Sequence, residues 1–131
     1  MIAIRSMRPS LSDVPTNVAD MITVDDVRRI TSTLPRSYEV VVRDQIKFRV
    51  GQIVYVAFSR DETVMGVAFP KEERAAMVAA QPDKFMLARE SDMRYNWIDV
   101  RLDAIDLDEL RELVVDGWRM CVPKKVSAQV N

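Results

Sequence analysis

The sequence contains no histidine in its 131 residues. Histidine is the commonest general base near neutral pH and a common zinc ligand in proteins. Its absence excludes catalytic pairs of serine or cysteine with histidine and argues against most catalytic metal sites. We therefore expect a protein that is not an enzyme and that has no cofactor and no bound metal.

Cysteine occurs once, at Cys121, so the chain cannot form an internal disulfide. Nothing in this pattern indicates an oxidising compartment, and a cytoplasmic location is expected. Cys121 falls on the apolar stripe of the last expected helix, which favours a buried structural thiol. A reactive thiolate, the alternative, would need exposure and a nearby cation, and Lys124 and Lys125 are the cations closest to it in sequence.

Glycine is also scarce: the chain has three, and none belongs to a glycine-rich phosphate loop. No apolar run is long enough for a signal peptide or a membrane span, so no membrane partner is expected. Positive charge is not in excess, because 19 basic residues stand against 20 acidic ones. Since DNA and anionic membranes usually select a basic protein, this balance predicts that any DNA binding is weak.

Apolar side chains are plentiful enough for one hydrophobic core. Hydrophobic residues make up 48% of the chain and charged residues 30%, which is typical of a globular domain of this length. Residues 1–20 show no clear periodicity and contain two prolines, so we expect a loosely ordered N-terminal arm, or alternatively an edge strand or short helix packed on the domain. Residues 21–131 are expected to form a single domain.

Three stretches have apolar residues every three or four positions, which is typical of helices packed on one side. The first and third begin with the spacing of a capping box, and the second begins at a proline. The apolar stripe of the third includes Leu107, Trp118 and Cys121. The expected helices are residues 23–34, 70–81 and 106–122.

Between and after these helices, apolar and polar residues alternate as they do in strands of an antiparallel sheet. The expected strands are residues 38–43, 46–50, 53–58, 63–69 and 97–102. Residues 84–87 are expected to form a short extended segment. In the last strand Ile98 and Val100 point inward and Trp97 the other way. The order predicts an α+β domain with three main helices packed on an antiparallel β-sheet.

Three carboxylates near the start of the third helix, Asp103, Asp106 and Asp108, could in principle hold a divalent cation. Acidic residues also gather at helix starts because they cap free N–H groups and complement the helix dipole. The spacing lacks the glycine and terminal glutamate of a calcium loop. The capping role is therefore favoured.

Basic and aromatic residues on the expected strands could share one surface of the sheet. Such a surface suits contact with phosphates and stacking on bases. The alternative is a solvated face of ordinary alternating charge, to which Glu39, Asp44 and Asp99 would contribute. The candidate nucleic-acid-binding residues are Arg43, Lys47, Arg49, Arg94, Tyr95, Trp97 and Arg101.

Several short motifs, taken in order, resemble the MmcQ/YjbR-like family over about residues 22–126. They are the helix of residues 23–35 ending in Leu-Pro, Phe48-Arg49-Val50-Gly51, Pro70-Lys71-Glu72-Glu73, Tyr95-Asn96-Trp97-Ile98, and Asp108-Glu109-Leu110 before Trp118. The resemblance implies a CyaY-like fold, similar to a double-wing DNA-binding domain, and a DNA-binding role.

The chain departs from the family pattern at two positions. Members often have a basic residue shortly after the hairpin glycine, where this chain has Ile53, and a glycine before the strand tryptophan, where it has Asn96. The first departure removes a positive charge from the implied binding face. Weak DNA binding is therefore one expected function, and a non-enzymatic module that binds a protein partner or a small ligand is the alternative.

Overall fold

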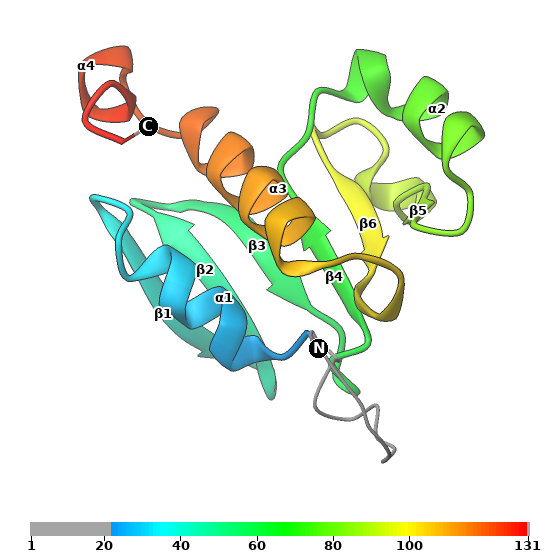
Figure 1. Cartoon of the computed structure of the whole chain (residues 1–131), viewed down its shortest axis with the longest axis horizontal. Helices are drawn as coiled ribbons and strands as arrows, with labels where there is room; N and C mark the ends of the chain where they lie inside the picture. Colours follow the sequence, from blue (N-terminus) through cyan, green and yellow to red (C-terminus); the bar gives the residue numbers. More distant parts are fainter. Residues whose placement is uncertain (1–21, 131) are drawn as a thin grey trace, which may run out of the picture.

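A six-stranded antiparallel sheet with helices on one face forms the protein, in the computed structural model that describes residues 22–130 (Figure 1). This confirms the expected α+β class with three main helices. The expected N-terminal arm, residues 1–20, lies outside the described residues. The elements in chain order are α1 (Val24–Thr31), β1 (Ser37–Val42), β2 (Gln45–Val50), β3 (Ile53–Phe58), β4 (Val64–Val67), α2 (Lys71–Ala80), β5 (Phe85–Met86), η2 (Glu90–Asp92), β6 (Ile98–Arg101), η3 (Leu102–Ala104), α3 (Leu107–Arg119) and α4 (Lys124–Ser127).

The first four strands follow one another as a meander, and β6 then pairs with β4, so that the strand order is β1-β2-β3-β4-β6-β5. Chain segments too short for a crossover connect the meander strands, which dictates antiparallel pairing. The turn from β1 to β2 has positive φ at Arg43 and Asp44, and the turn from β2 to β3 has φ 60° at Gly51. Turns of this kind match the twist of a hairpin.

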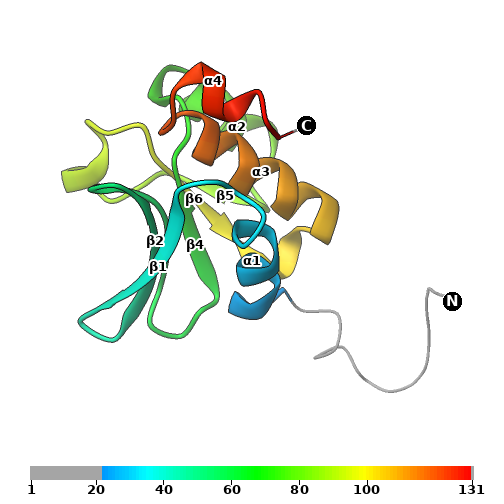
Figure 2. The same ribbon diagram turned by 90° about the vertical axis from the view of Figure 1, so that its left-hand side faces the viewer.

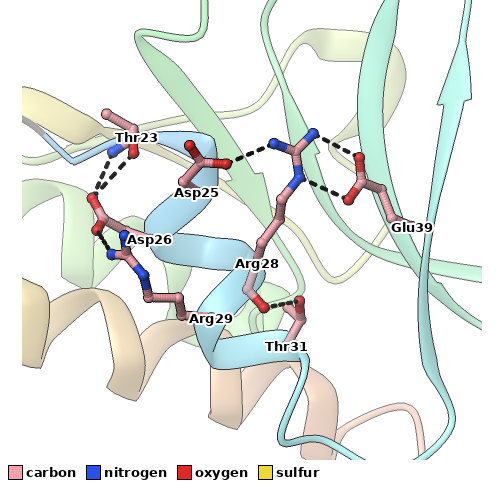
Figure 3. A network of polar contacts seen from close by, with 7 residues as sticks. All are labelled: Thr23, Asp25, Asp26, Arg28, Arg29, Thr31 and Glu39. Atoms are coloured by element: carbon pink, nitrogen blue, oxygen red, sulfur yellow. Dashed lines mark hydrogen bonds and ion pairs between the residues drawn. The ribbon is translucent and has the colours of Figure 1, made fainter.

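Helix α1 begins where the capping pattern predicts. The Thr23 N–H donates to the Asp26 carboxylate at 2.9 Å (Figure 3). The helix ends at Thr31, three residues earlier than expected, because the chain tightens into a turn in which the Leu34 N–H donates to the Thr31 carbonyl at 3.0 Å. The proline at position 35 thus follows a turn and does not itself end the helix.

Arg28 joins α1 to β1. Its Nε and Nη2 donate to the two carboxylate oxygens of Glu39 at 2.9 and 2.8 Å, and its Nη1 donates to Asp25 at 2.8 Å (Figure 3). The hydrogen bonds from Arg28 hold the pKa of the Glu39 carboxyl below its usual value. Glu39 therefore faces the helices, and it does not neutralise the opposite face of the sheet.

The core lies between the sheet and the helices α1 and α3. Val27, Phe48, Val100 and Trp118 are almost completely buried there, and each such side chain contributes on the order of 1.5–3 kcal/mol. The Trp118 indole N–H donates to the Pro35 carbonyl at 2.8 Å, which satisfies its one polar group. Trp118 is therefore a core residue, as the helical stripe predicts.

Two further details distinguish the structure from the expected pattern. Leu107 was expected on the buried stripe of the third helix, but it is 57% exposed because it begins α3 on the solvent side. A bulge in β3 inserts Tyr55 between the partners of Phe48 and Arg49. Tyr55 turns into the core, shares a hydrogen bond of 2.5 Å with Ser37, and burial raises its pKa to about 12.

Helices α1 and α3 lie on one side of the sheet, and the segment between β5 and β6 projects beyond the other side (Figure 2, yellow-green). We call the side that α1 and α3 leave uncovered the outer face. No helix within residues 22–130 is both long enough and apolar enough to cross a bilayer.

Candidate ligand-binding cleft

The outer face of the sheet is hollowed into a cleft of about 720 Å³. Its floor is a row of register partners on successive strands: Lys47 on β2, Ala57 on β3, Gly66 on β4 and Asp99 on β6. Because Ala57 carries only a methyl group and Gly66 carries no side chain, the centre of this row is low, and larger side chains line the cleft around it. We call this hollow the Trp97 cleft; it is defined by Lys47, Ala57, Gly66, Tyr95, Trp97 and Asp99.

The indole of Trp97 packs directly against Gly66 inside the cleft. A Cβ atom added to Gly66 would lie 2.4 Å from the indole Nε1, 2.5 Å from Cζ2 and 2.6 Å from Cε2. The indole therefore meets the strand with the edge that carries its nitrogen. Any side chain at position 66 would collide with it, so glycine is needed here for close approach and not for an unusual φ.

Arg74 holds the segment that carries Trp97. The side chain is buried, and its Nη1 donates to the carbonyls of Tyr95 and Trp97 at 3.0 and 2.8 Å, while Nη2 donates to the carbonyl of Met93 at 2.6 Å. Three carbonyl dipoles thus solvate a buried positive charge. Arg74 is a positioning residue for the cleft.

Asn96 adds a second link between this segment and α2. Its Oδ1 accepts a hydrogen bond from the Lys71 N–H at 3.0 Å, and its carbonyl accepts one from the Phe69 N–H at 3.2 Å. Pro70, the N-cap residue of α2, makes no side-chain cap. Asn96 therefore caps α2 from a distant part of the chain, a role that glycine at this position could not fill.

Sequence reasoning missed Arg74 as a residue that shapes the site. It lies three and four positions before Met77 and Val78, which pack against the core. Residues at this spacing share one helix face. The presence of a lone cation on the apolar face of α2 was the available signal, because a buried arginine needs hydrogen-bond acceptors from elsewhere.

The charges that line the cleft balance one another. Two cations, Lys47 and Arg89, and two carboxylates, Asp92 and Asp99, line it. Arg89 Nε lies 3.5 Å from the Asp92 carboxylate. Burial raises the pKa of Asp99, the negative charge of Asp92 raises it further, and Trp97 and Arg89 act in the opposite direction. The cleft is therefore polar and close to neutral overall.

Apolar side chains form part of the lining of the cleft. Ile53, Tyr95 and Met120 line it although they are 53%, 52% and 42% exposed, and Cys121 lines it as well. Burial raises the pKa of Cys121, which keeps the thiol protonated. The expectation of a buried thiol holds only in part, because Cys121 is partly exposed to the cleft.

The structure brings together Lys47, Tyr95 and Trp97 of the seven candidate residues, since these three line the cleft. Arg49 and Arg101 are also on the outer face, because each alternates with buried neighbours, but they do not line the cleft. The Nε of Arg49 is buried and has no hydrogen-bond partner among the described residues.

The other two candidates, Arg43 and Arg94, do not line the cleft. Arg43 is in the turn between β1 and β2. Arg94 turns toward its neighbour Tyr95: its guanidinium lies 4.9 Å from the centre of the Tyr95 ring, and its Nη2 donates to the Tyr95 hydroxyl at 2.8 Å. Of the five candidate cations only Lys47 lines the cleft, so they do not form one continuous patch within it.

The carboxylates of Asp106 and Glu109 cap the N-terminus of α3. The Glu109 N–H donates to Asp106 Oδ1 at 2.8 Å, and the Asp106 N–H donates to the Glu109 carboxylate at 3.2 Å. Over residues 22–130, no group of three or more histidine, cysteine, aspartate or glutamate side chains is placed to hold a metal ion. Asp106 is thus a cap, as its spacing predicts.

A family model described as YjbR matches residues 32–120 of the chain. Among solved structures, the Deinococcus radiodurans protein DR2400, a DUF419 domain, is similar with a TM-score of 0.69 and 20% sequence identity. The similarity covers 84% of this chain and 88% of that one, and at this identity it shows the fold. No curated protein matches the chain.

Proposed function

This chain belongs to the YjbR family, and on that premise we propose that it is a non-enzymatic binding protein whose ligand lies in the Trp97 cleft. The observation that carries the proposal is the cleft itself: a hollow of about 720 Å³, walled by an indole and floored by Ala57 and Gly66. Ligand sites of proteins have this size and this mixture of aromatic walls with a few polar groups.

Two features support binding without catalysis. The chain contains no histidine, and the thiol at the cleft has a raised pKa, which disfavours the nucleophilic thiolate. The proposal includes a cytoplasmic location, which the single free thiol at Cys121 supports.

Filling the floor of the cleft tests this function. The thermal unfolding midpoint is measured for the wild type, Ala57→Leu and Ala76→Leu with a panel of nucleotides, amino acids, organic acids and sugar phosphates. Ala57 lines the cleft, whereas Ala76 is exposed on α2 and provides the same substitution elsewhere. We expect at least one class of compound to raise the midpoint of the wild type and Ala76→Leu but not of Ala57→Leu. Equal shifts in all three proteins, or no shift with any compound, would contradict the proposal.

DNA is the second candidate ligand, and one observation favours it. The outer face of β1 and β2 carries Lys47 and Arg49 and no carboxylate, because Glu39 is turned toward Arg28 on the helical face. Arg101 adds a third outward cation on β6. About six phosphate contacts are normally needed for strong binding, so this face supports weak binding to duplex DNA.

A salt titration tests DNA binding directly. We expect weak binding of a short duplex at about 50 mM salt that falls steeply by about 200 mM. Replacing Lys47 and Arg49 together by alanine should reduce the logarithmic salt slope by roughly 2, one unit for each lost phosphate contact. Binding without a salt slope, or none at the lower salt, rules DNA out.

A further inference from the structure

The apolar lining of the Trp97 cleft is suited to a flat ring. Three of the large hydrophobic side chains that residues 22–130 leave exposed, Ile53, Tyr95 and Met120, line the cleft together with Trp97. Exposed apolar side chains that cluster at a hollow mark a contact site. The rings of Trp97 and Tyr95 line it, and although the Arg94 guanidinium lies over one face of Tyr95, the remaining ring surface favours a planar aromatic partner.

The two ends of the floor require opposite chemistry from a ligand. Lys47 and Asp99 occupy opposite ends of the row, separated by the two strands that carry Ala57 and Gly66. Three strand spacings place their Cα atoms roughly 14 Å apart, which is too far for the two side chains to pair. Within the described residues neither forms an ion pair. A complementary ligand needs an anionic group near Lys47 and a hydrogen-bond donor near Asp99.

A nucleotide combines these three features in one molecule. Its base is planar, an amino group on the base donates hydrogen bonds, and its phosphate is an anion at the far end. We infer that the Trp97 cleft binds a free nucleoside monophosphate with an amino group on its base, with the base against Trp97 and Tyr95, the amino group donating to Asp99, and the phosphate at Lys47. This inference rests on the proposed function of the cleft.

The limited size and the balanced charge of the site favour the free nucleotide over a polynucleotide. The cleft has a volume of about 720 Å³, which is the size of a small-molecule site, and the charged residues that line it are two cations and two carboxylates. A strand of nucleic acid would need a continuous basic track for its backbone, whereas Asp92 and Asp99 interrupt the cations here.

Binding is measured by isothermal titration of the full chain with AMP, adenosine, IMP, inorganic phosphate and a six-nucleotide deoxyadenosine oligomer. Trp97 fluorescence gives a second signal, because Trp118 is completely buried and shielded from ligands. We expect AMP to bind best. Adenosine, which lacks the phosphate, and IMP, which lacks the amino group, should each bind about ten- to a hundredfold more weakly, the usual effect of one charged hydrogen bond.

Two variants locate the phosphate and the amino group. Lys47→Ala should weaken AMP by about tenfold or more and leave adenosine unchanged. Asp99→Asn should weaken AMP and leave IMP unchanged. Lys125→Ala is the matched control, because it removes an exposed cation of the short helix α4 that does not line the cleft. It should leave all affinities as they are.

The outcomes separate this inference from the proposed function. If another compound class occupies the cleft and AMP does not bind, the nucleotide is wrong and the binding function stands; if nothing binds, both fail. If inorganic phosphate bound as tightly as AMP, the proposed contact between the base and Trp97 would be contradicted. An oligomer that binds more tightly than AMP, with a steep salt slope, would overturn the free nucleotide in favour of a nucleic acid. AMP binding that neither Lys47→Ala nor Asp99→Asn changes would overturn the assigned site.

Discussion

The edge of the Trp97 indole occupies the space that a side chain of Gly66 would need, with Nε1 2.4 Å from the position of a Cβ atom. Trp97 comes just before β6 and Gly66 lies in the middle of β4, its register partner being Asp99. The shape of the cleft therefore depends on one missing side chain in the centre of the sheet.

Replacing Gly66 by alanine should displace the indole into solvent. Trp97 is only half-buried and can turn outward, so the free energy of unfolding should fall by only about 1 kcal/mol, at the low end for overpacking. The emission maximum of tryptophan should shift to longer wavelength. Gly51→Ala is the matched control: it strains a residue with φ 60° but has no atom within 4 Å of the added Cβ, so it should lower stability without changing emission. Unchanged emission in Gly66→Ala would contradict the contact.

Removing the Arg74 guanidinium should loosen the segment from Met93 to Trp97. Arg74→Met keeps much of the side-chain volume and leaves three carbonyls without their donor, which should cost roughly 2–4 kcal/mol. Amide hydrogen exchange across residues 93–97 should accelerate. Arg94→Met, at an exposed position whose guanidinium contacts only Tyr95 in the described structure, should change stability by less than about 0.5 kcal/mol. Similar protection of the segment in both variants would show that Arg74 does not hold it.

Ionisation of Asp99 should lower the free energy of unfolding of the wild type as the pH rises. Burial raises the pKa of its carboxyl in the folded state, whereas an unfolded aspartate titrates near ~3.9. Between these two values the folded protein binds more protons than the unfolded one, so stability falls as the pH rises through this window and the cost persists above it.

Asp99→Asn removes this cost, so the variant should gain stability relative to the wild type at neutral pH, and the gain should shrink toward about pH 3.5. Urea denaturation at several pH values measures it. The charge of Asp92 raises the pKa of Asp99 and that of Arg89 lowers it, so the gain reports burial and these two neighbours together. Glu39→Gln is the opposite case, because Arg28 lowers the pKa of Glu39 in the folded state. The Glu39–Arg28 ion pair stabilises the fold at pH values above the pKa of an unfolded glutamate, and this stabilisation is lost as the pH falls. Glu39→Gln should therefore lower stability at neutral pH. The same sign for both variants would contradict these assignments.

Gly117 lets α3 approach β4 closely. A Cβ atom at this position would lie 3.0 Å from Val67 Cγ2 and 3.1 Å from the Ala68 carbonyl. Gly117→Val should therefore lower the free energy of unfolding by about 1–3 kcal/mol. Glu112→Val places the same residue on the exposed side of α3 and should cost much less. Chemical denaturation of the two variants compares them directly, and equal losses would show that close packing at Gly117 is unimportant.

Most elements could be predicted because their signals are local. The capping boxes at Thr23 and Asp106 mark the starts of α1 and α3 correctly, since a cap is made within three or four residues. The alternation in residues 97–102 correctly separates the inward Ile98 from Trp97. The local pattern gave the wrong burial at the start of α3. Leu107 was expected in the core, but a side chain in the first turn of a helix can point to solvent as well as inward.

The amino-acid sequence by itself determined the helices, the hairpins and the side of the strand on which Trp97 lies, because periodicity and capping act over a few residues. Only the tertiary structure decided that β6 pairs with β4, which places Trp97 on Gly66, 31 positions away in the chain. It also decided that Arg74 reaches carbonyls 19 to 23 residues further on. Such contacts depend on strand order and on how α2 packs, and these follow from burial of the whole core rather than from any local run of residues.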